Sequence, residues 1–261
     1  MQRSVELTPT ARWWPSVLYQ TATLEVVRDG ERLLVDPGIA LWEIAEVSGD
    51  GAGHILLTHA DWDHVMAVGV LADARVHASA GTAERIGSGE AVRSVRKHAA
   101  QFYVAVEGLD RLRVDEVVAE GTGAIGPWSA EFRHAPGHSP DGLVTLLPEE
   151  SLLIVGDHLS ELEVPFVEDS ARAYAETLRM LDDLIGSTAP AHVVIGHGPP
   201  LPPDQARRVA GEDLAYLERL LAYAEGGGDP ERPDAVAVPR GPADGTGHAD
   251  NVRLTCGEVA E

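Results

Sequence analysis

Residue types that the sequence holds in small number exclude several classes of protein. The 261 residues include one cysteine, Cys256, which excludes an intramolecular disulfide framework and a cysteine-rich zinc site. No run approaches the ~20 consecutive apolar residues of a membrane span, and the first residues lack the apolar core of a signal peptide. We therefore expect a cytoplasmic protein.

Positive charge is also scarce. Lys and Arg together number 20 against 42 Asp and Glu, which gives a formal net charge of −22. A surface this acidic repels phosphate backbones and anionic lipid headgroups. We expect no nucleic-acid or membrane partner, and instead a small-molecule substrate bound by a monomer or homodimer. The 44% of hydrophobic residues is enough for a sizeable core.

Short apolar runs alternate with helical patterns along the chain. Asp29 and Gly30 separate two alternating runs, which predicts a hairpin of residues 23–28 and 31–35. A helical pattern extends from about residue 79 to about residue 102, and Leu178 and Leu181 belong to an apolar stripe at helical spacing. The other expected strands are 16–20, 54–58, 75–78, several within 111–134, 142–147, 151–155 and 191–195, and the other helices are 41–48, 169–185 and 203–224.

These elements predict one α/β domain over residues 1–225, followed by a tail over residues 226–261. The tail is rich in Gly, Pro and Asp as far as residue 247, which predicts irregular structure there. Its end has two interpretations. It is a frayed terminus, or it forms a final helix that packs on the domain with His248 and Asn251 on one face.

The segment from Thr58 to His64 carries the most chemical information. It places two imidazoles and two carboxylates within six positions, directly after a strand expected to be buried. Imidazole and carboxylate together suit zinc, iron or manganese. Taken alone, the same residues would also fit a solvated acidic turn.

Three later segments follow the same rule of a strand and then a polar residue. His138 follows a Pro-Gly turn, Asp157 ends an apolar run, and His197 lies between two glycines that allow close backbone approach. Side chains at equivalent strand ends can converge in space. The sequence therefore indicates a metal site assembled from four segments.

The order and spacing of these residues resemble the metallo-β-lactamase superfamily over residues 17–198. The resemblance implies an α/β fold, a four-layer αββα sandwich with metals at one edge. It also implies two divalent metal ions, zinc in the first place, with iron or manganese as alternatives. Carried over position by position, the first metal is held by His59 and His138, the second by Asp63, His64 and His197, and both by a bridging Asp157.

One position departs from the motif of the superfamily. Asp61 stands where the usual motif has its second His. As a carboxylate it still ligates the first metal, through oxygen instead of nitrogen, and this makes the first site harder and more anionic. This departure leaves open the identity of the metal and whether the first site is fully occupied.

The resemblance implies a metal-dependent hydrolase that uses a metal-activated hydroxide. A pair of cations lowers the pKa of bound water to ~7 from ~15.7, and Asp63 is the expected catalytic residue because it both ligates and orients the nucleophile. The acidic chain favours a small, neutral or apolar ester, thioester or lactone. Two alternatives stay open: an iron-dependent oxidoreductase acting on a persulfide or oxygen, and a non-catalytic metal-binding module.

Residues beside the expected ligands are candidates for a substrate pocket. They are Trp62, which alternatively packs on the next helix; His158, which alternatively orients a ligand; Phe166; and His248. Asp36 resembles a structural carboxylate of the superfamily, and its alternative is a turn Asp that accepts from nearby backbone N–H groups.

Overall fold

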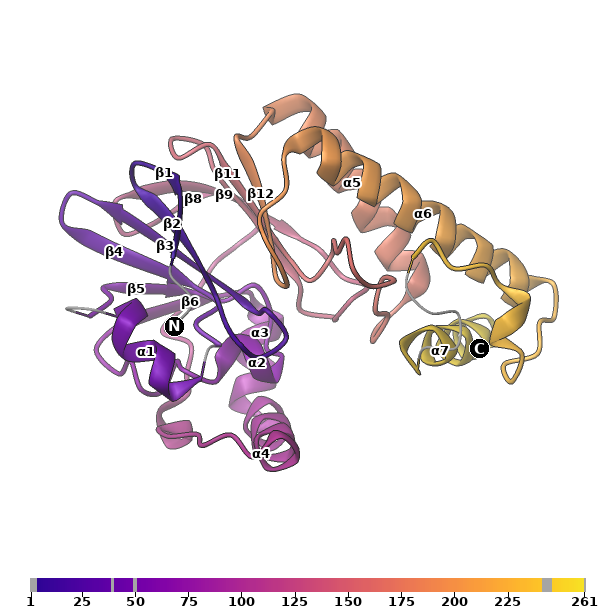
Figure 1. Cartoon of the computed structure of the whole chain (residues 1–261), viewed down its shortest axis with the longest axis horizontal. Coiled ribbons are helices and arrows are strands. Elements are labelled where there is room, and N and C mark those ends of the chain that lie inside the picture. Colours follow the sequence, from indigo (N-terminus) through magenta and orange to yellow (C-terminus); the bar gives the residue numbers. More distant parts are fainter. Residues whose placement is uncertain (1–3, 39, 49–50, 241–245, 261) are drawn as a thin grey trace.

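Two β-sheets pack face to face, with helices on both outer faces (Figure 1). The computed structural model describes residues 4–38, 40–48, 51–240 and 246–260. Within these ranges the layers run helix, sheet, sheet, helix, which confirms the expected αββα sandwich. No helix in the described ranges is both long and apolar enough to cross a membrane.

The first sheet begins antiparallel and ends parallel. Its strands lie side by side in chain order, with β1–β4 antiparallel and β4–β7 parallel. The predicted hairpin is confirmed, because Asp29 and Gly30 have φ of +53° and +82° and join paired strands. The strands are β1 (Val5–Thr8), β2 (Ala11–Pro15), β3 (Ala22–Arg28), β4 (Glu31–Val35), β5 (His54–Leu56), β6 (Arg75–Ala78) and β7 (Glu116–Val117).

The second sheet is antiparallel except at one edge, where β11 and β12 are parallel. Buried side chains of both sheets, such as Leu24 and Leu56 on one and Phe132 and Ile154 on the other, form the core between them. In spatial order the strands are β12 (His192–Ile195), β11 (Leu152–Gly156), β10 (Leu143–Leu147), β9 (Trp128–His134) and β8 (Gly121–Ile125).

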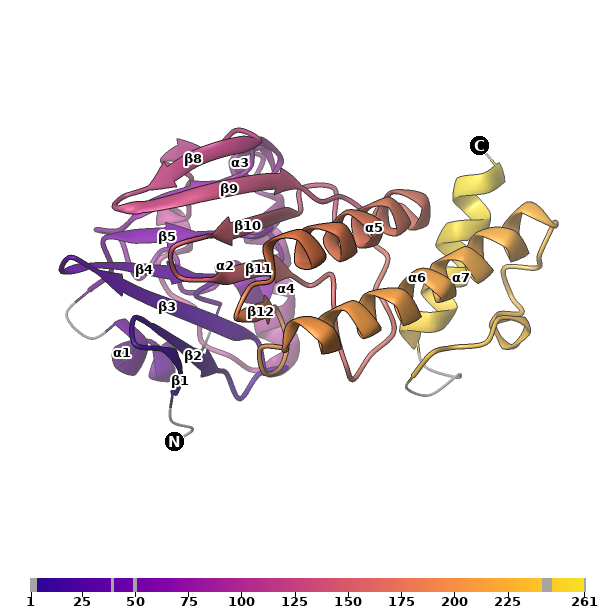
Figure 2. The ribbon, with the colours of Figure 1, turned by 90° about the horizontal axis from the view of Figure 1, so that it is seen from above.

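The outer layers are amphipathic helices, and α5 shows why they form. Leu178 and Leu181 on α5 are buried against the second sheet, as their helical spacing predicts. Figure 2 shows α5 and α6 running over the second sheet. The helices are α1 (Leu41–Ser48), α2 (Trp62–Val65), α3 (Ala80–Gly87) and α4 (Glu90–Phe102) beside the first sheet, and α5 (Ala171–Thr188) and α6 (Pro203–Glu225) on the second, with short 3-10 turns η1 (Leu109–Arg111) and η2 (Pro233–Ala235).

The strand predicted over residues 16–20 is wrong. Residues 17–20 form a turn after β2, in which the N–H of Thr21 donates to the carbonyl of Leu18 at 3.0 Å. Tyr19 and Gln20 at its centre have φ of +52° and +54°. A short apolar run does not distinguish a strand from a turn by periodicity, and here the left-handed backbone ends the extended chain.

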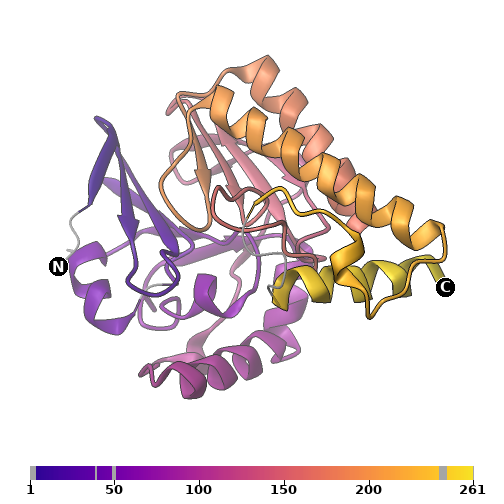
Figure 3. The same cartoon turned by 45° about the vertical axis from the view of Figure 1, so that its right-hand side comes forward.

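The C-terminal segment forms a helix, α7 (Thr246–Ala260), that lies against α6 (Figure 3). Asn251 on α7 is fully buried. Its Nδ2 donates to the carbonyl of Pro165 at 2.6 Å and to Tyr216 Oη at 3.1 Å, and its Oδ1 accepts from the N–H of Val167 at 2.9 Å. These bonds fix α7 on the domain. Part of the segment expected to be irregular, residues 241–245, lies outside the described residues.

We predict that Asn251→Ala lowers the free energy of unfolding by about 1–3 kcal/mol, because it leaves the buried N–H of Val167 and the carbonyl of Pro165 without their partner. Urea denaturation measures the change. The matched control is Asp250→Ala on the exposed side of the same helix, which changes stability by less than about 0.5 kcal/mol. Equal stability of the two variants would contradict the docking role of Asn251.

Candidate metal centre

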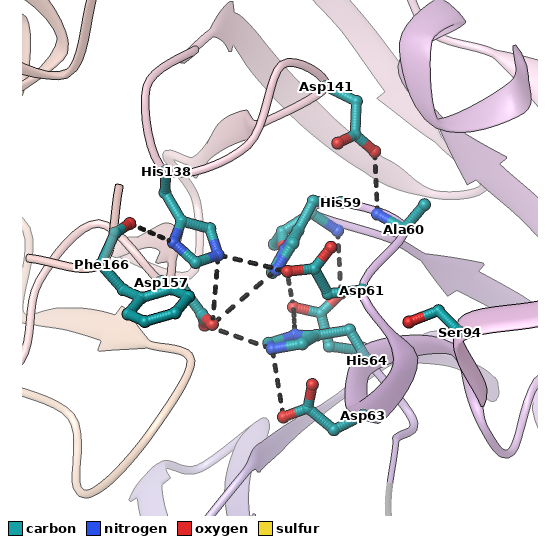
Figure 4. A network of polar contacts seen from close by, with 12 residues as sticks. His59, Ala60, Asp61, Asp63, His64, Ser94, His138, Asp141, Asp157 and Phe166 are labelled. Carbon is teal, nitrogen blue, oxygen red and sulfur yellow. Dashed lines mark hydrogen bonds and ion pairs between the residues drawn. The ribbon is translucent and has the colours of Figure 1, made fainter. Parts of the chain in front are cut away.

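The candidate ligands meet where strands of both sheets end. Figure 4 shows the side chains of six of them directed toward one another: His59, Asp61, Asp63, His64, His138 and Asp157. His59 follows β5, His138 follows β9, Asp157 follows β11 directly, and His197 follows β12. Short loops after buried strands hold these side chains rigidly. The chain topology thus brings together residues that are separated by up to 138 positions in the sequence (197 − 59).

Each of the four histidines uses its Nδ1 to contact a group outside the centre, which turns its Nε2 inward. Two of these contacts are hydrogen bonds to backbone carbonyls and two are contacts with side chains. The partners are Thr58 Oγ1 for His59 at 2.9 Å, Asp36 Oδ2 for His64 at 3.1 Å, the Phe166 carbonyl for His138 at 2.9 Å and the Tyr19 carbonyl for His197 at 3.0 Å.

The inward atoms surround Asp157. Its Oδ2 lies 3.0 Å from His197 Nε2, 3.6 Å from His138 Nε2 and 3.8 Å from His59 Nε2, and its Oδ1 lies 3.2 Å from His64 Nε2. For a metal–nitrogen distance of about 2.0–2.1 Å, tetrahedral ligand atoms lie about 3.4 Å apart. The measured spacing is therefore that of ligands around a cation.

Buried polar atoms without hydrogen-bond partners support the same interpretation. Among the described residues, Nε2 of His59, His64 and His138 and Oδ1 of Asp157 are buried with no such partner. Leaving buried polar atoms unpaired is costly, and a bound cation would satisfy them. Two groups are compact enough to hold one ion each: His59, His138 and Asp157; and Asp63, His64 and His197. These are the residues that the sequence assigns to the two metals, with Asp157 between them.

Asp63 lies in the second group in a fixed orientation. Its Oδ2 accepts a hydrogen bond from Thr21 Oγ1 at 2.9 Å and lies 3.4 Å from His197 Nε2 and 3.7 Å from His64 Nε2. Thr21 is fully buried, directly precedes β3 and forms an isolated antiparallel bridge with His197. The hydroxyl therefore holds the carboxylate toward the centre.

Asp61 lies beside the first group and faces two ways. Its Oδ2 is 3.4 Å from His138 Nε2 and 3.5 Å from His59 Nε2, while its Oδ1 accepts from Arg85 Nη2 at 2.9 Å. The compact first group contains Asp157 and not Asp61. One oxygen of Asp61 is thus directed to the first site, as a single oxygen donor.

The carboxylates determine the ionisation of the metal-free cluster. Burial lowers the pKa of His197, but the charge of Asp157, the hydrogen bond to it and the charge of Asp63 together outweigh burial and raise the pKa to about 9. Burial also lowers the pKa of His138. A hydrogen bond to Asp61 and the charge of Asp157 more than offset this effect and raise the pKa to about 9. Burial favours the neutral forms of Asp61 and Asp157, yet the imidazoles hold both pKa values well below the usual range. Without metal, the cluster is a set of buried ion pairs.

Gly196 shows how tightly the centre is packed. A Cβ at this position would lie 1.7 Å from Asp157 Oδ1 and 3.1 Å from His64 Cε1. Only glycine allows the backbone to pass this close. The glycine before His197 in the sequence therefore has the role expected of it, which is close approach beside a ligand.

Two of the predicted pocket residues, Trp62 and Phe166, lie beside the centre. The ring of Trp62 stacks on His98 and Phe102 of α4, with centroids 4.9 and 5.6 Å apart, so it packs on the next helix. Phe166 is 41% exposed and its ring centroid lies 6.4 Å from that of His138. Phe166 is thus placed to contact a small molecule bound at the centre.

The other two, His158 and His248, use both ring nitrogens inside the protein. His158 is buried, with its nitrogens 2.7 Å from the Val155 carbonyl and 2.8 Å from the Ala135 carbonyl. His248 is buried between Tyr216 Oη at 2.8 Å and the Pro233 carbonyl at 2.9 Å. This geometry favours structural roles for both residues over the predicted contacts with substrate.

Several residues outside the ligand set hold the ligands in position, and the sequence indicated one of them, Asp36. Asp36 accepts from both the N–H and the Oγ1 of Thr58, at 2.8 and 2.6 Å, and so connects the end of β4 to the loop of His59. The resemblance suggested this carboxylate, whereas Tyr19, Thr21 and Arg85 had no local signal. Asp141, within Pro-Asp-Gly, looks like an ordinary turn residue in the sequence.

Comparison with known proteins agrees with this geometry. A family model described as the metallo-beta-lactamase superfamily matches residues 17–220. A metallo-beta-lactamase family protein from Thermus thermophilus has a TM-score of 0.67 at 20% identity, over 96% of this chain and 93% of that chain. No curated protein matches the sequence.

Two further solved structures extend the comparison. A stereoselective inverting sec-alkylsulfatase from Pseudomonas sp. has a TM-score of 0.71 at 14% identity, over 98% of this chain and 50% of that chain. The protein TTHA1623, solved in a di-iron-bound form, has a TM-score of 0.56 at 25% identity, over 80% of this chain and 98% of that chain. The sulfatase and the Thermus thermophilus family protein, below 25% identity, show the fold alone.

We predict that the metal-free protein loses stability as the pH rises from about 6.5 to about 9. His138 and His197 have folded-state pKa values of about 9, above the unfolded value of about 6.5. A raised pKa stabilises the fold fully below the unfolded value, and this contribution disappears as the pH passes the folded value. Chemical denaturation across this range measures it.

Metal loading should remove this dependence, because ligating imidazoles are neutral and binding releases their protons. The variant His197→Gln should weaken the dependence in the metal-free protein. A free energy of unfolding that stays constant from pH 6.5 to 9 without metal would contradict the raised pKa values.

Proposed function

Because this chain belongs to the metallo-beta-lactamase superfamily, we propose that it is a metal-dependent hydrolase of a small, neutral or apolar ester, thioester or lactone. The observation that carries the proposal is the convergence of four imidazole Nε2 atoms on the Asp157 carboxylate. Such a donor set fits a pair of divalent cations, zinc in the first place.

Different residues of the chain would hold the two cations and orient the attacking water. His59, His138 and Asp61 would hold the first cation, and Asp63, His64 and His197 the second, with Asp157 shared. Two bound cations would acidify water near neutral pH and polarise the carbonyl under attack. Asp63, held by Thr21, would orient the attacking water. Cys256 lies on α7, away from the cluster, and is no candidate nucleophile.

Exposed aromatic rings beside the centre support an apolar substrate. Tyr19 is 54% exposed and Phe166 41% exposed, and their carbonyls are the groups that orient His197 and His138. The ring of Tyr19 also contacts Trp62 edge-on, with centroids 6.0 Å apart. Exposed rings on the segments that orient these ligands offer contacts to an acyl chain rather than to a charged group.

The cation nearest the first site is not free to bind an anionic substrate. Arg85 contacts the carboxylates of Asp61, Asp141 and Glu90 at 2.9, 2.5 and 2.8 Å. Together with the net charge of −22, this pairing disfavours substrates that carry phosphate or carboxylate near the scissile bond. The proposal is therefore restricted to neutral substrates.

A second candidate function is iron-dependent redox chemistry on a persulfide or oxygen. Two observations favour it: the oxygen donor of Asp61 is harder than imidazole, and TTHA1623 was solved with two irons. Elemental analysis separates the candidates. About two equivalents of zinc support hydrolysis, whereas iron together with oxygen consumption supports the redox reaction.

We predict that Asp63→Ala lowers kcat/KM for the best ester, thioester or lactone by about a hundredfold or more, because it removes a ligand and the group that orients water. Spectrophotometric assays of metal-loaded protein over a panel of such substrates measure the effect. Asp182→Ala, an exposed carboxylate on α5, is the control and keeps full activity. Absence of turnover across the whole panel with metal bound would refute the hydrolase.

The exposed rings of Tyr19 and Phe166 lead to a prediction about the length of the acyl chain that the enzyme prefers. Tyr19 adopts a left-handed backbone that asparagine tolerates better, so Tyr19→Asn changes stability by less than about 1 kcal/mol. We expect it to raise KM for octanoyl esters about fivefold, which corresponds to the loss of one aromatic contact, and to leave acetyl esters unchanged.

Tyr103→Asn is the matched control for this experiment. Tyr103 also has a left-handed backbone, with φ of +55°, but its side chain is 96% exposed at the end of α4. Its replacement should not alter the preference for chain length. Equal KM ratios for octanoyl and acetyl esters in wild type and Tyr19→Asn would show that the ring does not contact substrate.

A further inference from the structure

Arg85 links the first metal site to the interior of the protein. It lies on α3, with a side chain that is 15% exposed, and its Nη2 contacts Asp61 Oδ1 at 2.9 Å. Its Nη1 contacts Asp141 Oδ1 at 2.5 Å, and Asp141 is 1% exposed. A half-buried arginine held by several carboxylates is fixed in position and permanently charged.

Asp141 connects this pair to the ligand loops. Its Oδ2 accepts from the N–H of Ala60 and from Thr82 Oγ1, both at 2.8 Å. Ala60 stands between His59 and Asp61, and Asp141 closes the loop that carries His138. Figure 4 shows the bond from Asp141 to Ala60 beside the cluster. One arginine thus fastens the loop of Asp61 to the loop of His138.

The charges at position 61 explain why an arginine is needed there. A neutral imidazole at this position would add no charge to the centre, whereas the carboxylate of Asp61 adds one negative charge. The guanidinium of Arg85 adds one positive charge 2.9 Å away. Arg85 shares this charge with Asp141 and Glu90, so it offsets part of the negative charge that Asp61 adds in place of the imidazole of the usual motif.

The geometry also limits how Asp61 can bind a cation. Oδ1 faces Arg85 and accepts from it, whereas Oδ2 faces the first site, 3.4 Å from His138 Nε2 and 3.5 Å from His59 Nε2. An imidazole likewise presents a single donor atom. The pair therefore matches the imidazole in the number of donor atoms and has part of its extra negative charge offset by Arg85.

We propose that Arg85 is a positioning residue that offsets the charge of Asp61, so that the pair presents one oxygen donor with reduced negative charge to the first metal. The inference rests on the metal centre of the proposed function but not on hydrolysis. It makes the metal affinity of the first site depend on the charge at position 85.

Zinc titration of the metal-free protein against a chromophoric chelator tests the proposal. Arg85→Gln removes a cation beside the first site, and we expect zinc to bind that site more tightly, on the order of tenfold. Arg85→Lys retains the charge and should bind zinc within about twofold of wild type. Arg207→Gln, which breaks an exposed ion pair with Asp182, is the control for loss of one positive charge and should have no effect.

The sign of the change distinguishes charge compensation from a purely structural role. If Arg85 only held the loops together, Arg85→Gln would bind zinc more weakly or equally, and either result would overturn the proposal. The variant Asp61→Asn provides a second test. It removes the negative charge between Arg85 and the first site and weakens that site, and adding Arg85→Gln should recover zinc affinity on the order of tenfold. A further loss in the double variant would also overturn it.

A surface variant covers the case in which Arg85→Gln does not fold. Glu90 is 52% exposed and contacts Arg85 Nε at 2.8 Å. Glu90→Lys replaces this anion with a cation, and we expect about threefold weaker zinc binding at low salt, reduced at high salt. An unchanged affinity would count against the proposal.

A wild-type protein that binds two zinc ions without hydrolysing any ester would refute the proposed function and leave this inference standing.

Discussion

The carboxylate of Asp157 is the point on which the arrangement of the site depends. It is contacted by imidazoles from loops of both sheets, at 3.0 to 3.8 Å, and it lies where β11 ends beside β12. A buried carboxylate is tolerated only with partners of opposite charge or with a metal. Four histidines facing one carboxylate therefore need either protons or cations to remain buried together.

The Nδ1 atoms of His197 and His138 need hydrogen-bond partners, and the loops at Tyr19 and Phe166 are shaped to provide them. The carbonyls of Tyr19 and Phe166 orient His197 and His138, and a turn with two left-handed residues presents the first of these carbonyls. Left-handed backbone at non-glycine residues is unfavourable by about 1–2 kcal/mol each. The rest of the fold offsets this strain, and the result is a fixed ligand with an aromatic ring beside it.

The C-terminal helix α7 also helps to hold His138 in position. Asn251 binds the backbone on both sides of Phe166, through the Pro165 carbonyl and the Val167 N–H. The carbonyl of Phe166 in turn accepts from His138. A residue of α7 thus reaches the first site through one peptide segment, so the segment expected to be a tail is structurally connected to the chemistry.

The sequence alone determined the mixed α/β elements, the hairpin at Asp29–Gly30 and the candidate ligands, because strand periodicity, turn residues and short motifs are local signals. The layered sandwich was implied by the resemblance to the superfamily. The sequence did not indicate the turn at Tyr19, the partner of Asp61 or the place of His248. Arg85 is 24 residues from Asp61 in the sequence, and Asn251 is 84 residues from Val167. Only the tertiary structure decided these contacts, because the partner of a side chain depends on which loops the packed sheets bring to the same edge.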